Sequence, residues 1–297
     1  MTQTEILTAV ERDVPPIVET CIQEIRHIAT LPAVAHKLTC LMNDGNATAN
    51  DINKTIATDP AICVRILKVV NSSFYGLTKQ IATTDRAVQL LGFNAVKNIA
   101  LAASLHKILR TANTVPSFNI GDLWIHSVAV ATGARALAGK AGLALPDEAF
   151  LAGLIHDIGI MIEVQARPQK FAEITEILFC APGLTFRQAE ERVLGATHES
   201  FGAVLCRKWN FPMQFVHVAG FHHEPMQLPE SDCVLPAIVH VADILASHTG
   251  LGYSRTVETD TIDQQILNVL GLREDDIEAI AEMLPDAIRE TEQLFCI

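Results

Sequence analysis

The sequence has too few basic residues to favour nucleic acid or anionic lipid as a partner. Lys and Arg number 22 against 34 Asp and Glu, which gives a formal net charge of −12 over 297 residues. A chain with this acidic excess is repelled by phosphate backbones and by acidic membrane surfaces. We therefore expect protein partners or small ligands, and no direct binding to nucleic acid or to a membrane.

Paired cysteines and export signals are also missing. The seven cysteines are scattered singly, without a Cys-x-x-Cys spacing, and their number is odd. This usage is typical of reduced thiols in a cytoplasm. No basic segment followed by an apolar stretch stands at the start, and no uncharged apolar run is long enough to cross a bilayer. These patterns predict a cytoplasmic protein.

Alternating, strand-like segments are scarce, whereas helical periodicity runs through nearly the whole chain. Residues 17–28 carry one apolar stripe of this kind. Helix starts agree with the periodicity, since Asp59 precedes Pro60, and Thr185 with Gln188 has the spacing of a capping box. Hydrophobic residues make up 49% of the chain, enough for a large core. The sequence predicts an all-α protein.

A polar, turn-rich stretch at residues 111–122, "TANTVPSFNIGD", interrupts two long helical patterns. It divides the chain into two predicted parts, an N-terminal helical bundle over residues 1–115 and a second helical domain over residues 116–297. The tail from about residue 258 is acidic and helical in pattern. It either packs on the second part or mediates homodimerisation, and its amphipathic pattern favours packing.

Four patterns in the first part occur in a specific order. They are Leu31-Pro32, the Asp59-Pro60 helix start, the "NSSFYG" turn at 71–76 and "AVQLLGFNAVKNIAL" at 87–101. In this order they resemble the HDOD family, the HD-related output domain of bacterial signalling proteins, and the resemblance extends over about residues 15–250. It implies a regulatory module that acts on a signalling partner, whose identity the sequence does not reveal.

The same segment also has a purely structural interpretation. Asn71 and Gly76 suit a chain reversal after a helix, and the apolar stripes suit a packed bundle. Phe74 and Tyr75 are either core aromatics or anchors for a partner, and we favour the core. We interpret the first part as a structural bundle with a protein-binding groove.

Seven histidine and aspartate residues of the second part fall in five groups on separate predicted helices, in the order H, HD, H, HH, D. They are His126, His156, Asp157, His198, His222, His223 and Asp243. A buried hydrogen bond would explain each residue alone, but burying all seven without a metal would be costly. Imidazole nitrogen mixed with carboxylate oxygen suits Fe, Mn, Zn or Co. Facing helices of a bundle can direct such ligands inward.

The order of these residues resembles the HD superfamily of metal-dependent phosphohydrolases, particularly its HD-GYP branch. The resemblance implies one metal ion held by His126, His156, Asp157 and Asp243. It also implies that Asp157 bridges to a second ion held by His198, His222 and His223. We expect two divalent transition-metal ions, iron first, with manganese, zinc or cobalt as alternatives.

Asp122 is a further candidate ligand. It stands four residues before His126, on the same helical face, and some HD-GYP proteins use an acid at this offset. An acid in the first turn of a helix also complements the helix dipole. Both interpretations stay open.

Two departures from the HD-GYP pattern argue against catalysis. Ile160 stands where those enzymes carry a lysine after "HDIG", and "HHEPMQLPESD" stands where their glycine-tyrosine-proline signature would follow. In an active relative, a hydroxide held with Asp157 at the two ions would attack phosphorus, and the lysine would neutralise phosphate charge. We therefore expect an HDOD-type regulatory protein with a two-metal site and no efficient catalysis.

Two other functions stay open. The full ligand series would also serve a metal-dependent phosphohydrolase that acts on a nucleotide or another phosphate-containing ligand without needing the lysine. A third and weaker alternative is a sensor of oxygen or redox state that uses a histidine-carboxylate centre with two irons.

Overall fold

The computed structural model describes residues 14–25, 32–72, 75–109, 115, 118–181 and 183–295. Within these ranges the chain forms helices and turns without a strand, apart from one isolated bridge between Val115 and Phe118. The predicted all-α fold is therefore confirmed. Leu31 and Phe74, which belong to the patterns that suggested the family, lie outside the described residues.

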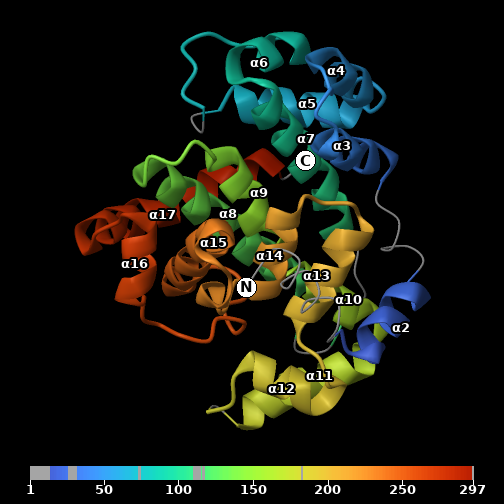
Figure 1. Ribbon diagram of the computed structural model, residues 1–297, viewed down its shortest axis with the longest axis vertical. Coiled ribbons are helices and arrows are strands. Elements are labelled where there is room, and N and C mark those ends of the chain that lie inside the picture. The colour runs from blue at the N-terminus through green and yellow to red at the C-terminus, as the bar shows by residue number, and fades with distance from the viewer. Residues whose placement is uncertain are drawn as a thin grey trace.

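Five helices of the first part form a bundle at one end of the molecule (Figure 1). They are α3 (Ala33–Asn43), α4 (Ala49–Ile56), α5 (Pro60–Val70), α6 (Thr84–Leu91) and α7 (Phe93–Leu109). Asp59 caps α5 as predicted, because its carboxylate accepts hydrogen bonds from the backbone N–H groups of Ala61 and Ile62. Asn71 organises the turn after α5, donating to the carbonyl oxygen of Ile81 and accepting from its N–H.

In the second part, α9 packs against α8, α14 and α15, and α10 packs against α13 and α11. The helices of this part are visible in Figure 1. They are α8 (Ile120–Lys140), α9 (Pro146–Ile155), α10 (Ile158–Ala166), α11 (Pro168–Cys180), α12 (Phe186–Leu194), α13 (His198–Lys208), α14 (Met213–Phe221), the short 3-10 helix η1 (Pro225–Gln227) and α15 (Glu230–His248). The predicted capping box of Thr185 and Gln188 begins α12. Helices α11 and α12 lie at the end opposite the N-terminal bundle (Figure 1).

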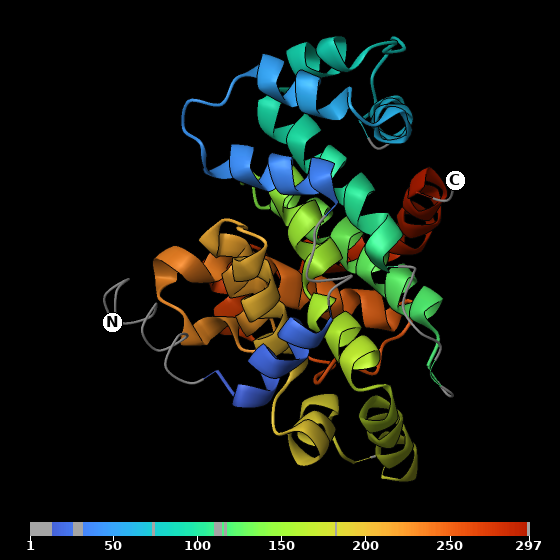
Figure 2. The ribbon, with the colours of Figure 1, turned by 90° about the vertical axis from the view of Figure 1, so that its right-hand side faces the viewer.

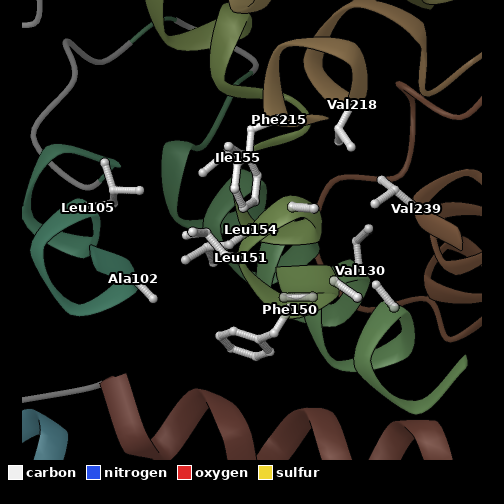
Figure 3. Close-up of a cluster of buried hydrophobic side chains, with 14 of the residues drawn as sticks. Ala102, Leu105, Val130, Phe150, Leu151, Leu154, Ile155, Phe215, Val218 and Val239 are labelled. Carbon is white, nitrogen blue, oxygen red and sulfur yellow. The ribbon is translucent and has the colours of Figure 1, made fainter. Parts of the chain in front are cut away.

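The hydrophobic core runs through both parts without a break. Figure 3 shows α9 side chains such as Leu151 and Leu154 packed among residues of α8, α14 and α15, with Leu105 of α7 nearby. Helix α7 thereby joins the N-terminal bundle to α9. Burial on this scale is the main stabilising contribution to the fold. The boundary near residue 115 stays a prediction.

A polar contact reinforces the junction between the two parts. The Tyr75 hydroxyl donates a 2.7 Å hydrogen bond to Asp147 in the first turn of α9. The Arg135 guanidinium pairs with the same carboxylate at 2.6 Å and lies 4.5 Å from the centroid of the Tyr75 ring. Burial raises the pKa of Tyr75, so the phenol keeps its proton and remains a donor. Tyr75 thus anchors the first part on the second.

Replacing Tyr75 by phenylalanine should lower the free energy of unfolding by about 1.5–3 kcal/mol, because a hydrogen bond to a charged acceptor is lost while the ring stays. Urea unfolding of the single variants Tyr75→Phe and Asp147→Ala and of the double variant measures the coupling between the two residues. Additive effects in this cycle would show that the hydroxyl contact contributes nothing.

The ends of the described chain pack on the second part. Helix α2 (Pro16–Glu24) lies against α10 and α13 (Figure 2), and Glu24 forms an ion pair with Arg167. After α16 (Gln264–Leu270), α17 (Glu274–Phe295) contacts α8 and α5, burying Ile280, Leu284 and Ile288. The helical tail predicted from the sequence is present, and its apolar face covers α8.

Residues 146–166 have the length and the mean hydropathy, 1.4, of a membrane-spanning helix, yet 89% of that apolar window is buried inside the protein. The segment comprises α9 and α10 with the turn between them. It therefore has the character of a core segment.

Candidate metal centre

The seven predicted residues meet in the interior of the second part. His126 comes from the second turn of α8, His156 and Asp157 from the turn between α9 and α10, and His198 from the first position of α13. His222 and His223 directly follow α14, and Asp243 lies on α15. All seven side chains are buried, with His223 the most accessible at 9%. Their backbones are held by helices rather than by long loops, which gives a rigid site.

One group of donors surrounds one oxygen of Asp157. His156 Nε2 lies 3.3 Å and His126 Nε2 lies 3.8 Å from Asp157 Oδ2. Asp243 Oδ1 lies 2.9 Å from His126 Nε2 and 3.8 Å from His156 Nε2. Donor atoms of His126, His156 and Asp157 lie close enough together to hold a metal ion.

A second group surrounds the other oxygen of the same carboxylate. His198 Nε2 and His222 Nε2 lie 3.4 and 3.5 Å from Asp157 Oδ1. His223 Nε2 lies 3.1 Å from His198 Nε2, so these three histidines also form a group able to hold a metal ion. Asp157 therefore stands between two donor groups and presents one oxygen to each.

The outer ring nitrogens of three histidines, His156, His198 and His222, face acceptors that fix their tautomers. His156 Nδ1 donates to the carbonyl oxygen of Gly153 at 2.8 Å, and His222 Nδ1 donates to that of Val218 at 3.1 Å. A carbonyl oxygen only accepts, so the ring hydrogen resides on Nδ1. In the neutral ring, Nε2 then carries a lone pair that faces the centre, as in metal-binding histidines.

Several buried polar atoms at the centre make no well-directed hydrogen bond with the described residues, although most of them lie at ion-pair distances from one another. They are both ring nitrogens of His126, His156 Nε2, both oxygens of Asp157 and Asp243 Oδ1. Each such atom costs about 1–3 kcal/mol when it is left unsatisfied. Lone pairs of nitrogen and carboxylate oxygen that converge without a donor suit a transition-metal cation. The residues present thus fit the group that the family resemblance implies.

In the metal-free chain, ionisable groups compensate one another. Burial opposes charging of His156, but the adjacent Asp157 carboxylate outweighs it and raises the pKa of His156 to about 9. Burial alone would raise the pKa of Asp157, yet His156 holds it well below its usual range. Burial together with His222 and His198 lowers the pKa of His223. Asp157 thus stays anionic, and His223 stays neutral.

Two close backbone approaches bring these side chains together. A Cβ at Gly159 would overlap the carbonyl oxygen of His198 and lie 2.7 Å from the backbone nitrogen of Gly202, so α10 touches the start of α13. At Gly252, with φ of 77°, a Cβ would overlap the backbone nitrogen of His126. Glycine at these positions allows Asp157 to reach His198 and fixes the backbone around His126.

Asp122 does not join either donor group. Its carboxylate accepts a 3.1 Å hydrogen bond from the Asn119 side chain at the start of α8. Its backbone carbonyl accepts a hydrogen bond from the N–H of Tyr253. An acidic residue in the first turn of a helix interacts favourably with the helix dipole, so Asp122 has a structural explanation that needs no metal.

Two buried acids that the sequence analysis did not identify stand behind His198. Glu190 Oε1 and Oε2 lie 3.0 and 2.9 Å from His198 Nδ1, and the Glu163 carboxyl contacts that of Glu190. Burial raises the pKa of both carboxyls well above the usual value. A signal was available, because Glu190 shares the buried face of Phe186 and Ala189 and Glu163 is a single acid within an apolar run.

The surroundings of the centre contain little available positive charge. Ile160 is fully buried in an apolar cluster with Phe171 and Val164. Arg187 lies 2.8–3.0 Å from three carboxylates, those of Glu199, Glu224 and Glu258. A pocket of about 610 Å³ beside His223 is lined by Glu224, Gln227, His240, Thr259, Thr261 and Asp263, among others, with no Lys or Arg among the described lining residues.

Sequence comparison identifies a family. The HDOD domain family model matches residues 28–225. An uncharacterised protein of Treponema pallidum is 24% identical over 216 residues, which is 69% of this chain and 39% of the relative. The chain thus corresponds to about two fifths of that relative's length.

Solved structures share the fold at low sequence identity. An HDOD domain protein of unknown function from Geobacter sulfurreducens has a TM-score of 0.80, with 21% identity and coverage of 98% of this chain and all of that one. A provisionally named signal transduction protein from Marinobacter aquaeolei scores 0.75, at 21% identity over 97% of this chain and 66% of its own. A provisionally named metal-dependent phosphohydrolase from Shewanella amazonensis scores 0.61, at 18% identity over 98% and 97%.

Proposed function

Because the chain belongs to the HDOD domain family, we propose that it is a signal-transduction module that binds two metal ions and has no efficient catalysis. The observation that carries the proposal is Asp157, whose two oxygens face separate histidine groups. The ions are divalent transition metals, iron first, with manganese, zinc or cobalt as alternatives that suit the same donors.

Two ligand sets follow from the two donor groups. His126, His156, Asp157 and Asp243 hold one ion, and Asp157, His198, His222 and His223 hold the other. Bound metal of this kind supplies Lewis acidity and charge compensation. The chain itself supplies orientation, since His156 and His222 are fixed by backbone carbonyls, and it limits water, since all seven side chains are buried.

The environment of the centre supports a non-catalytic role. Phosphoryl transfer needs positive groups directed at the phosphate oxygens. The wall that contains Ile160 is apolar, and the charge of Arg187 is compensated by three carboxylates. Among the described residues, the carboxylate of Asp157 pairs with histidines alone. Apart from the metal ions, a phosphate ester would therefore meet no uncompensated positive side chain among these residues.

The second candidate function is a metal-dependent phosphohydrolase on a nucleotide or other phosphate-containing ligand. It is favoured by the pocket beside His223, which leads from the surface to the second donor group, and by the name of the Shewanella relative. The acidic lining of the pocket counts against an anionic substrate.

We also propose that the protein works in the cytoplasm and binds neither a membrane nor, directly, nucleic acid. Its N-terminal bundle would contact a signalling protein, and a homodimer is one form in which it would act. The acidic net charge supports the absence of nucleic-acid binding.

Turnover measurements decide between the two functions. The metal-replete protein, purified without oxygen or chelator, should hydrolyse bis(p-nitrophenyl) phosphate and cyclic dinucleotides no faster than the variant His156→Ala. Turnover at roughly 1 s⁻¹ or more, which is ordinary for enzymes, would establish the phosphohydrolase if His156→Ala abolished it.

A further inference from the structure

The three histidines with fixed tautomers are not held alike. His156 and His222 donate their Nδ1 hydrogens to backbone carbonyls, of Gly153 and Val218. His198 Nδ1 instead faces the carboxyl of Glu190, with both oxygens within 3.0 Å. A carboxylate is the stronger acceptor and places negative charge beside the ring. His198 is thus the one of these three histidines whose Nδ1 faces a carboxyl group rather than a backbone carbonyl.

Glu190 and its neighbour Glu163 are costly to bury. Both side chains are 0% exposed, and neither oxygen of Glu163 has an N–H or O–H donor among the described residues. The contact of Glu163 with Glu190 is between two carboxyls, so it becomes a hydrogen bond only when they share a proton. An apolar pair would pack here at lower cost. The presence of two buried acids therefore indicates a function that needs their hydrogen bonds or charge.

We propose that Glu190 is a positioning residue for the second metal ion, and that Glu163 holds Glu190 in place. Accepting the Nδ1 hydrogen sets the rotation of the His198 ring and directs its Nε2 lone pair toward Asp157 Oδ1, 3.4 Å away. The one negative charge that Glu190 and Glu163 keep when they share a proton also strengthens Nε2 as a donor. The inference rests on the proposed two-ion centre. It assigns to Glu190 a higher metal affinity of the second position, and it leaves the affinity of the first position unchanged.

The variant Glu190→Gln separates charge from shape, because the amide oxygen still accepts from His198 Nδ1 while the negative charge is gone. Its Kd for the second ion should rise about 10–100-fold, with the first ion bound as in wild type. Titration with Mn²⁺ followed by electron paramagnetic resonance reports this directly. Wild type should reach a spin-coupled pair of ions, whereas Glu190→Gln at the same Mn²⁺ concentration should give an isolated ion.

Two further variants serve as controls. Glu191→Gln makes the same chemical change at the next, exposed position of α12, and it should bind both ions as wild type does. Glu163→Gln keeps the shape of its side chain and can still donate to Glu190, so it should weaken the second ion less than Glu190→Gln.

The outcomes separate the inference from the function on which it rests. A spin-coupled pair in Glu190→Gln at wild-type affinity would overturn the positioning role. So would equal losses in Glu163→Gln and Glu190→Gln, or the loss of both ions in Glu190→Gln. If wild type binds none of Mn²⁺, Fe²⁺, Zn²⁺ and Co²⁺, the proposed two-ion centre is wrong, and the positioning role is overturned with it.

Discussion

Replacing Asp157 by asparagine should remove both metal ions at once. Each oxygen of this carboxylate faces a different donor group, Oδ2 toward His126 and His156 and Oδ1 toward His198 and His222. Asparagine supplies one neutral acceptor oxygen, and its amide nitrogen turns N–H donors toward one group of lone pairs. The loss therefore extends to both positions, unlike the loss of a ligand that serves one ion.

Elemental analysis of chelator-free protein should show two ions per chain in wild type and almost none in Asp157→Asn. His223→Ala, which lacks a ligand of the second group only, should keep one ion. Asp260→Asn makes the same chemical change at an exposed residue and should keep both. In thermal unfolding, metal at 100 times its Kd should stabilise wild type by about 2.7 kcal/mol per ion and Asp157→Asn not at all. Retention of one tightly bound ion in Asp157→Asn would disprove the bridging arrangement.

Replacing Gly159 by alanine should destabilise the protein by about 3 kcal/mol or more, the upper range for an overpacked core. The new Cβ would overlap the carbonyl oxygen of His198 and crowd the backbone nitrogen of Gly202. Both contacts are to backbone atoms, so no side-chain rotation relieves them. Helices α10 and α13 must separate, and this moves Asp157 away from His198.

Urea unfolding of the metal-free protein isolates the packing effect of Gly159→Ala from the effect of bound metal. Gly139→Ala on α8 is the matched control, because a Cβ there meets no atom within 4 Å and alanine gains about 0.5–1 kcal/mol over glycine within a helix. The second ion should also be lost from Gly159→Ala while Gly139→Ala retains it. Wild-type stability in Gly159→Ala would show that the two helices are not packed as closely as described.

The seven central residues could be predicted from the sequence because the information is carried by their order along the chain. His126, His156 and Asp157 are hard to interpret singly, yet the order of the full set matches a known ligand series. Which oxygen of Asp157 faces which group depends on three-dimensional packing, so the sequence alone could not supply it. Asp122 shows the same limit, since its spacing from His126 was suitable but its side chain bonds to Asn119.

The fold class could also be predicted from the sequence, because hydrophobic periodicity and helix caps are local properties. Asp59 and the pair of Thr185 and Gln188 begin helices where the sequence indicated. The position of α2 could not be predicted from the sequence, because this helix packs on α10 and α13 of the second part, which are far from it along the chain. Glu190 could have been suspected from its place on the buried face of α12, but its contact with His198 depends on three-dimensional packing.

The most direct test of the proposed function is elemental analysis of the wild-type protein after anaerobic purification without chelator. We expect two transition-metal ions per chain, with iron as the main element. A metal content below one ion per chain that does not rise when Fe²⁺, Mn²⁺, Zn²⁺ or Co²⁺ is supplied would contradict the proposed function.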